Sequence, residues 1–176
     1  MGTHDEGQMM KLDLQPFQAA LGAEVKGIDL AQDLDAETFY QIEQAYNKYS
    51  VLLFRDQPFD ESQHLAFSRR FGQLEVHVLD QYLHPRHPEI LIVSNVTDGD
   101  RHIGIYDAGR YWHTDLSYMA VPSRGSLLYA IEVPHDDDGE PLGDTLFTST
   151  SAAYESLSDS MKIQITDLKA EFSLAN

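Results

Sequence analysis

Two stretches in the first half of the chain repeat apolar residues at intervals of three and four positions. Residues 35–49 begin with Asp35 and place five apolar side chains on one face: Phe39, Ile42, Ala45, Tyr46 and Tyr49. Residues 60–72 begin with Asp60, end with Gly72 and offer three more: Leu65, Phe67 and Phe71. Aspartate commonly caps a helix and glycine commonly ends one. Both stretches are therefore predicted to be amphipathic helices, with a short strand between them at residues 50–56 (SVLLFRD).

Beyond residue 88 the pattern changes to short runs of β-branched and aromatic residues, separated by proline, glycine and aspartate. The runs are 89–96 (EILIVSNV), 111–118 (YWHTDLSY), 125–133 (GSLLYAIEV) and 144–149 (DTLFTS). Strands at this spacing are typical of a β-sandwich or barrel. Residues 151–168 return to helical spacing, with a serine cap expected near Ser151. The sequence thus predicts one domain that is mostly β with flanking helices.

Charge narrows the classes of partner. The 176 residues include 12 basic and 29 acidic side chains, a net charge of −17 at neutral pH. Such a field repels phosphate backbones and anionic membrane surfaces, so neither nucleic acid nor membrane is an expected partner. An anionic small molecule would need a local arginine to overcome it.

The absence of cysteine excludes disulfides, zinc–thiolate sites and thiol nucleophiles, and it fits a cytoplasmic location. No apolar run approaches the length of a membrane span, and no basic segment followed by an apolar one suggests a signal peptide. Residues 1–10 (MGTHDEGQMM) are interpreted as a disordered leader or as residues added for expression.

The run 111–118 contains a histidine and an aspartate two positions apart, His113 and Asp115. On a strand both would point to one face, where an imidazole and a carboxylate can bind one ion. With a second histidine they would form the facial set that leaves Fe(II) open to oxygen and a cosubstrate. Chance alone predicts about one such pair, so a polar pair on the wet face of a strand is an equal alternative. The other pair, His135 and Asp137, lies in an acidic turn and is interpreted as solvated surface.

Several motifs follow one another in order around this pair. They are VLLFRDQ, HLAFSRRFGQLEVH, SNV, YWHTDLSYMAVPSRGSLLYAIEVP and GDTLFTSTSAAYESLS. In this order, from about Phe17 onward, the chain resembles the taurine and 2,4-D dioxygenase family of Fe(II)- and 2-oxoglutarate-dependent oxygenases. The resemblance implies a double-stranded β-helix, or jelly roll, in which His113 and Asp115 bind Fe(II). It also implies that the Thr145 hydroxyl binds a carboxylate of the cosubstrate 2-oxoglutarate, although Leu142 replaces a family glycine nearby.

The resemblance says less about the substrate. His77 matches a position that contacts the sulfonate in taurine-using members. Tyr106 and Arg110, like Tyr82, lie in loops that are expected to border the opening of the same binding site. Gly109 stands where the family has an asparagine that helps to bind taurine, which argues against taurine itself. The resemblance therefore implies a small anionic substrate: a sulfonate, sulfate ester or carboxylate. Without the resemblance, all of these positions are equally well read as ordinary loop residues.

The family's second iron histidine and its 2-oxoglutarate arginine have no match before the chain ends at EFSLAN. Residues 11–176 are therefore expected to be an oxygenase domain that lacks its C-terminal part, with an incomplete jelly roll; a degenerate member is the alternative. This chain alone is expected to be inactive and prone to self-association. The parent enzyme is expected to hydroxylate its substrate with O₂ and release succinate and CO₂. A non-oxidative zinc or manganese enzyme, a ligand-binding module without chemistry and a homo-oligomer all stay open.

Overall fold

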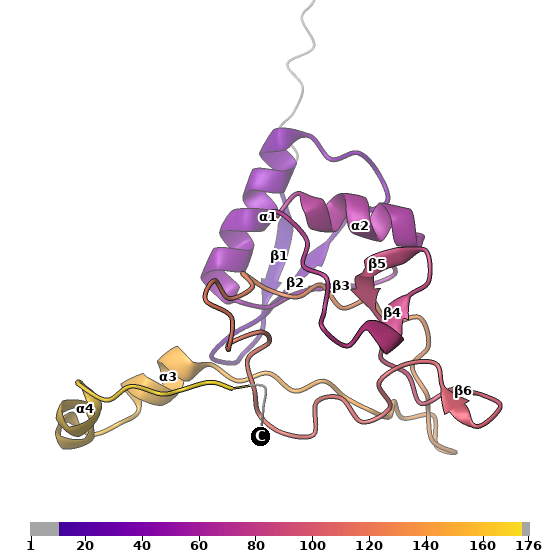
Figure 1. Cartoon of the computed structure of the whole chain (residues 1–176). Coiled ribbons are helices and arrows are strands. Elements are labelled where there is room, and N and C mark those ends of the chain that lie inside the picture. Colours follow the sequence, from indigo (N-terminus) through magenta and orange to yellow (C-terminus); the bar gives the residue numbers. More distant parts are fainter. Residues whose placement is uncertain (1–10, 174–176) are drawn as a thin grey trace, which may run out of the picture. The chain divides into compact units, whose positions relative to one another are not determined.

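The computed structural model describes residues 11–173 in two compact units, which divide between Phe71 and Gly72. The leader predicted for residues 1–10 lies outside the described residues. Elements of the first unit are, in chain order, β1 (Asp13–Pro16), β2 (Ala23–Lys26), α1 (Ala36–Tyr49), β3 (Leu52–Phe54) and α2 (Glu61–Arg69) (Figure 1). No helix in the described part of the chain is both long and apolar enough to span a membrane.

The first unit is a three-stranded sheet with two helices. Its strand order is β1-β2-β3; β1 pairs antiparallel with β2, and β2 pairs parallel with β3. Parallel neighbours need a crossover, and α1 supplies it. Side chains from the sheet and both helices form one core, which contains Leu12, Val25, Leu30, Phe39, Ile42, Phe59 and Phe67. All buried large apolar side chains of the described residues lie in this unit.

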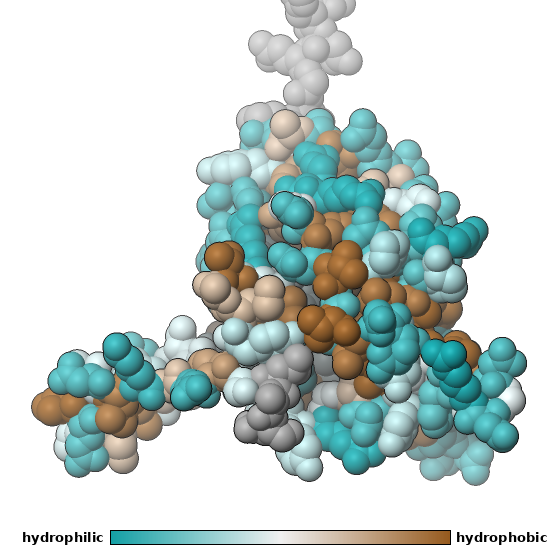
Figure 2. Space-filling model, viewed as in Figure 1, coloured by the Kyte–Doolittle hydropathy of each residue, from teal (hydrophilic) through white to brown (hydrophobic). Residues whose placement is uncertain are grey.

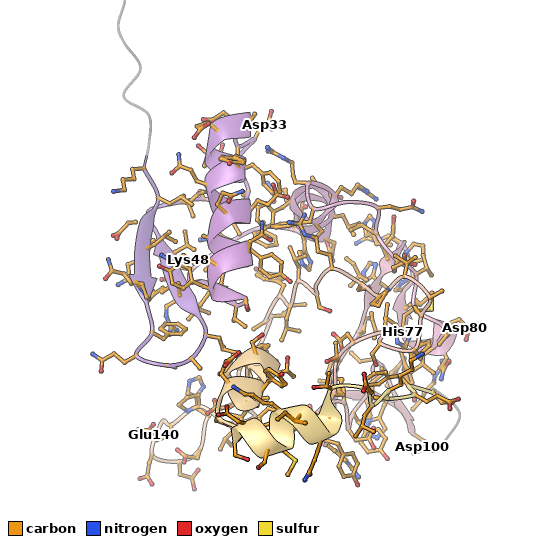
Figure 3. The ribbon with its side chains drawn as sticks, turned by 90° about the vertical axis from the view of Figure 1, so that its left-hand side faces the viewer. Asp33, Lys48, His77, Asp80, Asp100 and Glu140 are labelled. Carbon is orange, nitrogen blue, oxygen red and sulfur yellow. The ribbon has the colours of Figure 1, made fainter. Side chains whose placement is uncertain are left out.

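Both helices of the first unit begin where the sequence predicts. The Asp35 carboxylate accepts the backbone N–H and the hydroxyl of Thr38, and these two bonds hold the pKa of Asp35 below its ordinary value. Figure 3 labels Asp33, which precedes α1, and Lys48, which lies in its last turn. Asp60 and Gln63 cap α2 reciprocally. The second helix ends at Arg69, three residues before the predicted stop at Gly72.

The second unit contains only short elements. They are η1 (Asp80–Tyr82), β4 (Leu83–His84), β5 (His87–Leu91), β6 (Thr97–Asp98), β7 (Arg101–His102), α3 (Thr150–Glu155) and α4 (Asp159–Ile165). Strands β4 and β5 form one antiparallel pair, and β6 and β7 form another. Gly104 is the one fully buried residue in the described part of this unit. A side chain there would meet Ile92 O at 2.7 Å, so glycine lets residues 92–94 and 103–105 run close together.

Three of the four predicted strands of this unit are not formed. The run 89–96 overlaps β5 and adds a single bridge at Val93, but 111–118, 125–133 and 144–149 contain no strand. A strand is held by a ladder of backbone bonds to a neighbour, and the structure assigns no such ladder to these runs within the described residues. Their apolar side chains stay exposed: Val121 is 82% and Ile131 90% accessible. The described residues thus form small mixed sheets with a few helices, and the full barrel of a jelly roll is not seen.

Apolar atoms accordingly reach the molecular surface among polar ones (Figure 2).

The helical prediction for 151–168 also needs correction, because two helices form in place of one. Ser149 caps α3 by accepting the N–H of Ala152, two positions before the predicted cap at Ser151. Ser158 caps α4 by accepting the N–H of Met161. Serine side chains compete for backbone N–H groups, which favours a new helix start at Ser158 over one continuous helix.

Candidate metal centre

The segment that carries His113 and Asp115 is irregular and enters a turn at Asp115. Residues 115–118 form the turn, which the N–H of Met119 closes by donating to Leu116 O at 3.0 Å. Leu116 has a φ of 51°, a left-handed conformation that leucine rarely adopts and that costs about 1 kcal/mol or more. The predicted strand is wrong here, yet the predicted meeting of the two side chains is present. Nε2 of His113 lies 3.1 Å from Oδ1 of Asp115.

The other ring nitrogen of His113 determines which atom faces the carboxylate. Nδ1 lies 2.7 Å from the carbonyl oxygen of Tyr111. Because a carbonyl only accepts, Nδ1 must carry the proton of this bond. In the neutral ring Nε2 then presents its lone pair to Oδ1 of Asp115. A cation between these two lone pairs, either a proton or a metal ion, would stabilise the arrangement.

The distance between these two donor atoms fits a metal ion. Adjacent donors of an octahedral ion, each about 2.1 Å from it, lie about 3.0 Å apart, close to the 3.1 Å separation seen here. Both side chains are more than half exposed, so an ion could reach them from solvent. Within residues 11–173, no third histidine, aspartate or glutamate joins the pair to complete a cluster. The described chain therefore offers one imidazole and one carboxylate.

Asp115 has a second partner that sequence reasoning does not find. The hydroxyl of Ser126 donates to Oδ2 of Asp115 at 2.6 Å. Ser126 lies in the run 125–133, which the pattern marks only as a strand, and it stands eleven positions from the aspartate. No sequence signal other than its proximity to the motif would have selected it among the serines of the chain.

The other predicted site residues also lie in the second unit. Among the described residues, no hydrogen bond joins them to His113 or Asp115. Thr145 is exposed in the segment before α3. His77 is half-buried in the loop that leads to Asp80 (Figure 3), and its Nδ1 accepts the N–H of Leu79 at 3.1 Å. In the neutral ring its Nε2 therefore carries the proton and can donate to an anion. The roles of Thr145 and His77 stay predictions.

Tyr106 and Arg110 have local partners. The Tyr106 ring stacks on His102, with centroids 4.5 Å apart and planes 17° from parallel. Nη2 of Arg110 lies 3.4 Å from Oδ2 of Asp107, one turn back along the chain, in an exposed ion pair. Arg110 can therefore bind an external anion only by sharing or leaving Asp107.

His135, interpreted as solvated surface, is exposed as expected. Its neighbour Asp136 accepts the N–H groups of Asp138 and Glu140, which explains the acidic turn by local hydrogen bonding alone. Tyr82, by contrast, belongs to η1, where its carbonyl accepts the N–H of Ile92 at 2.9 Å. Neither His135 nor Tyr82 therefore adds a further candidate ligand to His113 and Asp115.

Comparison with known proteins gives a family match over nearly the whole chain. A sequence model described as "Taurine catabolism dioxygenase TauD, TfdA family" matches residues 13–176. The chain is 40% identical over 167 residues to "Pentalenolactone F synthase" of Streptomyces arenae, covering 93% of this chain and 54% of that protein. It is 33% identical to "(S)-phenoxypropionate/alpha-ketoglutarate-dioxygenase" of Sphingobium herbicidovorans (92% and 53% covered).

A third relative is "Alpha-ketoglutarate-dependent 2,4-dichlorophenoxyacetate dioxygenase" of Cupriavidus pinatubonensis, which is 31% identical over 173 residues (92% and 58% covered). The chain thus spans about half the length of the curated relatives that it matches. The matched region includes His113, Asp115 and Ser126.

Proposed function

Because the chain belongs to the family described as "Taurine catabolism dioxygenase TauD, TfdA family", we propose that its protein is an Fe(II)- and 2-oxoglutarate-dependent dioxygenase. The observation that carries the proposal is the His113–Asp115 pair, whose donor atoms face one another at 3.1 Å. Two relatives have names that specify dependence on alpha-ketoglutarate, which supports the same cosubstrate here.

Each ligand atom has a defined role in this proposal. Nε2 of His113 and Oδ1 of Asp115 would hold Fe(II), and the Tyr111 carbonyl keeps the Nδ1–H tautomer that leaves Nε2 free to bind. When bound, the iron would supply the oxidative chemistry with O₂, while 2-oxoglutarate is converted to succinate and CO₂. The Thr145 hydroxyl would donate to a carboxylate of 2-oxoglutarate.

The proposed fold is a jelly roll, of which residues 11–176 form one oxygenase domain without its C-terminal part. Coverage of about half of each relative supports this. So do the apolar runs 111–118, 125–133 and 144–149, which belong to no strand in the described residues and would become strands once neighbours pair with them. The same neighbours would cover side chains as exposed as Ile131.

We further propose that the substrate is a small organic anion. Phenoxypropionate and 2,4-dichlorophenoxyacetate, the substrates in two relatives' names, are both carboxylates. A net charge of −17 repels such molecules, so positive or donor groups must receive them. Arg110 and Nε2 of His77 are the proposed groups, and the Tyr106 ring is proposed to line the opening of the same binding site.

Succinate formation tests the function. The protein that carries this chain would be supplied with Fe(II), 2-oxoglutarate, ascorbate and O₂, with a panel of sulfonates, sulfate esters and carboxylates. Substrate-stimulated succinate is expected, and His113→Ala and Asp115→Ala should each abolish it. His135→Ala, an exposed histidine of the acidic turn, is the matched control and should keep full activity. Metal-dependent hydrolysis or isomerisation without succinate, or ligand binding without turnover, would refute the proposal.

A further inference from the structure

Asp115 is held on both of its oxygens, and each oxygen has a different partner. Oδ1 faces Nε2 of His113 at 3.1 Å, while Oδ2 accepts the Ser126 hydroxyl at 2.6 Å. The shorter distance is typical of a charge-assisted O–H···O⁻ bond. A carboxylate bound in this way cannot turn freely about its last torsion angle, so Oδ1 stays directed at the imidazole.

The imidazole is oriented by the same principle. Its Nδ1–H donates to the Tyr111 carbonyl, on the side of the ring opposite to the atom that faces Asp115. In both His113 and Asp115, therefore, one atom faces the other residue, and a second atom is held by a hydrogen bond to a third residue. Partners of this second kind set the direction and basicity of metal ligands.

A purely structural role explains the Ser126 bond poorly. Ser126 is exposed, Asp115 is 55% exposed, and the serine belongs to no helix or paired strand. Water competes for hydrogen bonds between exposed groups, so this bond contributes little to the stability of the fold. Its main effect falls on the orientation of one carboxylate.

We propose that Ser126 is a positioning residue of the metal site, which keeps Asp115 a monodentate ligand through Oδ1. The inference rests on the proposed function, because it assigns a role at the same pair. Removal of the hydroxyl should leave both ligands in place while the carboxylate rotates or binds through both oxygens. Loss of such a supporting partner typically lowers metal affinity by about tenfold to hundredfold.

Metal affinity, measured without turnover, tests this role. Co(II) would be titrated by calorimetry into the tag-free protein that carries this chain, and its visible absorption bands would report the ligand geometry. Ser126→Ala should bind Co(II) about tenfold to hundredfold more weakly, with altered bands. Ser126→Thr keeps a hydroxyl and should restore affinity. Ser123→Ala, three positions away on the same loop, is the matched control and should bind like the wild type.

The outcomes separate the two proposals. If His113→Ala binds Co(II) as tightly as the wild type, His113 and Asp115 do not form the metal site, and the proposed role of Ser126 is refuted as well. If His113→Ala loses affinity but Ser126→Ala does not, only the role of Ser126 is refuted. It is also refuted if Ser126→Ala lowers the melting temperature of the metal-free protein and the threonine variant fails to restore binding. Unchanged metal-free stability with weaker binding is the expected result.

Discussion

Neutralising Asp107 should improve the binding of an anionic substrate. Arg110 is the proposed anion receptor, but its Nη2 lies 3.4 Å from Oδ2 of Asp107. An incoming anion must compete with this carboxylate for the guanidinium. Asp107→Asn keeps the size of the side chain and removes the competing charge, so the KM for the substrate should fall.

The structure sets the size of this effect. The pair is exposed on both sides, 61% at Arg110 and 36% at Asp107, so the ion pair contributes only about 0.2–1 kcal/mol. If Asp107→Asn removes this competing interaction, substrate binding gains the same free energy, and the KM falls by about 1.4-fold to fivefold. Because surface charges are screened by salt, the gain should shrink as ionic strength rises from 0.01 M toward 1 M.

The assay is initial-rate succinate formation with the best anion of the substrate panel, at several salt concentrations. Asp100→Asn removes one negative charge from the same unit without touching the Arg110 pair, so it reports the general change in field. An Asp107→Asn variant that behaves like Asp100→Asn would refute competition by the ion pair. An unchanged KM in Arg110→Ala would refute the receptor role of Arg110 altogether.

Three further predictions test the cosubstrate site and the first unit. Thr145→Val keeps the β-branched shape but deletes one hydroxyl, so it should raise the KM for 2-oxoglutarate by about tenfold to hundredfold, with unchanged Co(II) affinity; an unchanged KM would mean that Thr145 binds no ligand. Ile42→Ala empties a fully buried position and should lower the unfolding free energy in urea by about 2–5 kcal/mol, whereas exposed Gln44→Ala on the same helix should change it by less than about 0.5 kcal/mol. The lowered pKa of Asp35 means that its charge stabilises the fold above the ordinary value of 3.8 and stops doing so as the pH falls below it. Asp35→Asn should therefore be less stable than the wild type at pH 6, and the two urea curves should converge in acid; a constant difference would contradict this.

The helices of the first unit are predictable from sequence because the information that specifies them is local. A cap such as Asp35 bonds a backbone N–H three residues away, and the apolar face of α1 repeats within a few turns. Phe39, Ile42 and Ala45 are buried as the spacing predicts. The end of α2 is less predictable, because the chain leaves the helix at Arg69, before the glycine is reached.

The closeness of His113 and Asp115 is predictable for a similar reason, since two residues that stand two positions apart are close in almost any conformation. The backbone conformation differs from the prediction, because a turn with Leu116 at positive φ replaces the predicted strand. The contribution of Ser126 is not predictable, because its bond to Asp115 joins positions eleven residues apart. Only the path of the chain between them brings the hydroxyl to the carboxylate.

The sequence alone therefore determined the two helical segments of the first unit and their N-caps, the candidate ligands His113 and Asp115, and a family resemblance that the comparisons confirmed. Tertiary structure decided which apolar runs pair as strands and which residue holds the second carboxylate oxygen of Asp115. The physical reason is the range of the interactions. Caps and helical faces depend on neighbours within about one or two turns, whereas a strand or a fixed carboxylate needs a partner from elsewhere in the chain.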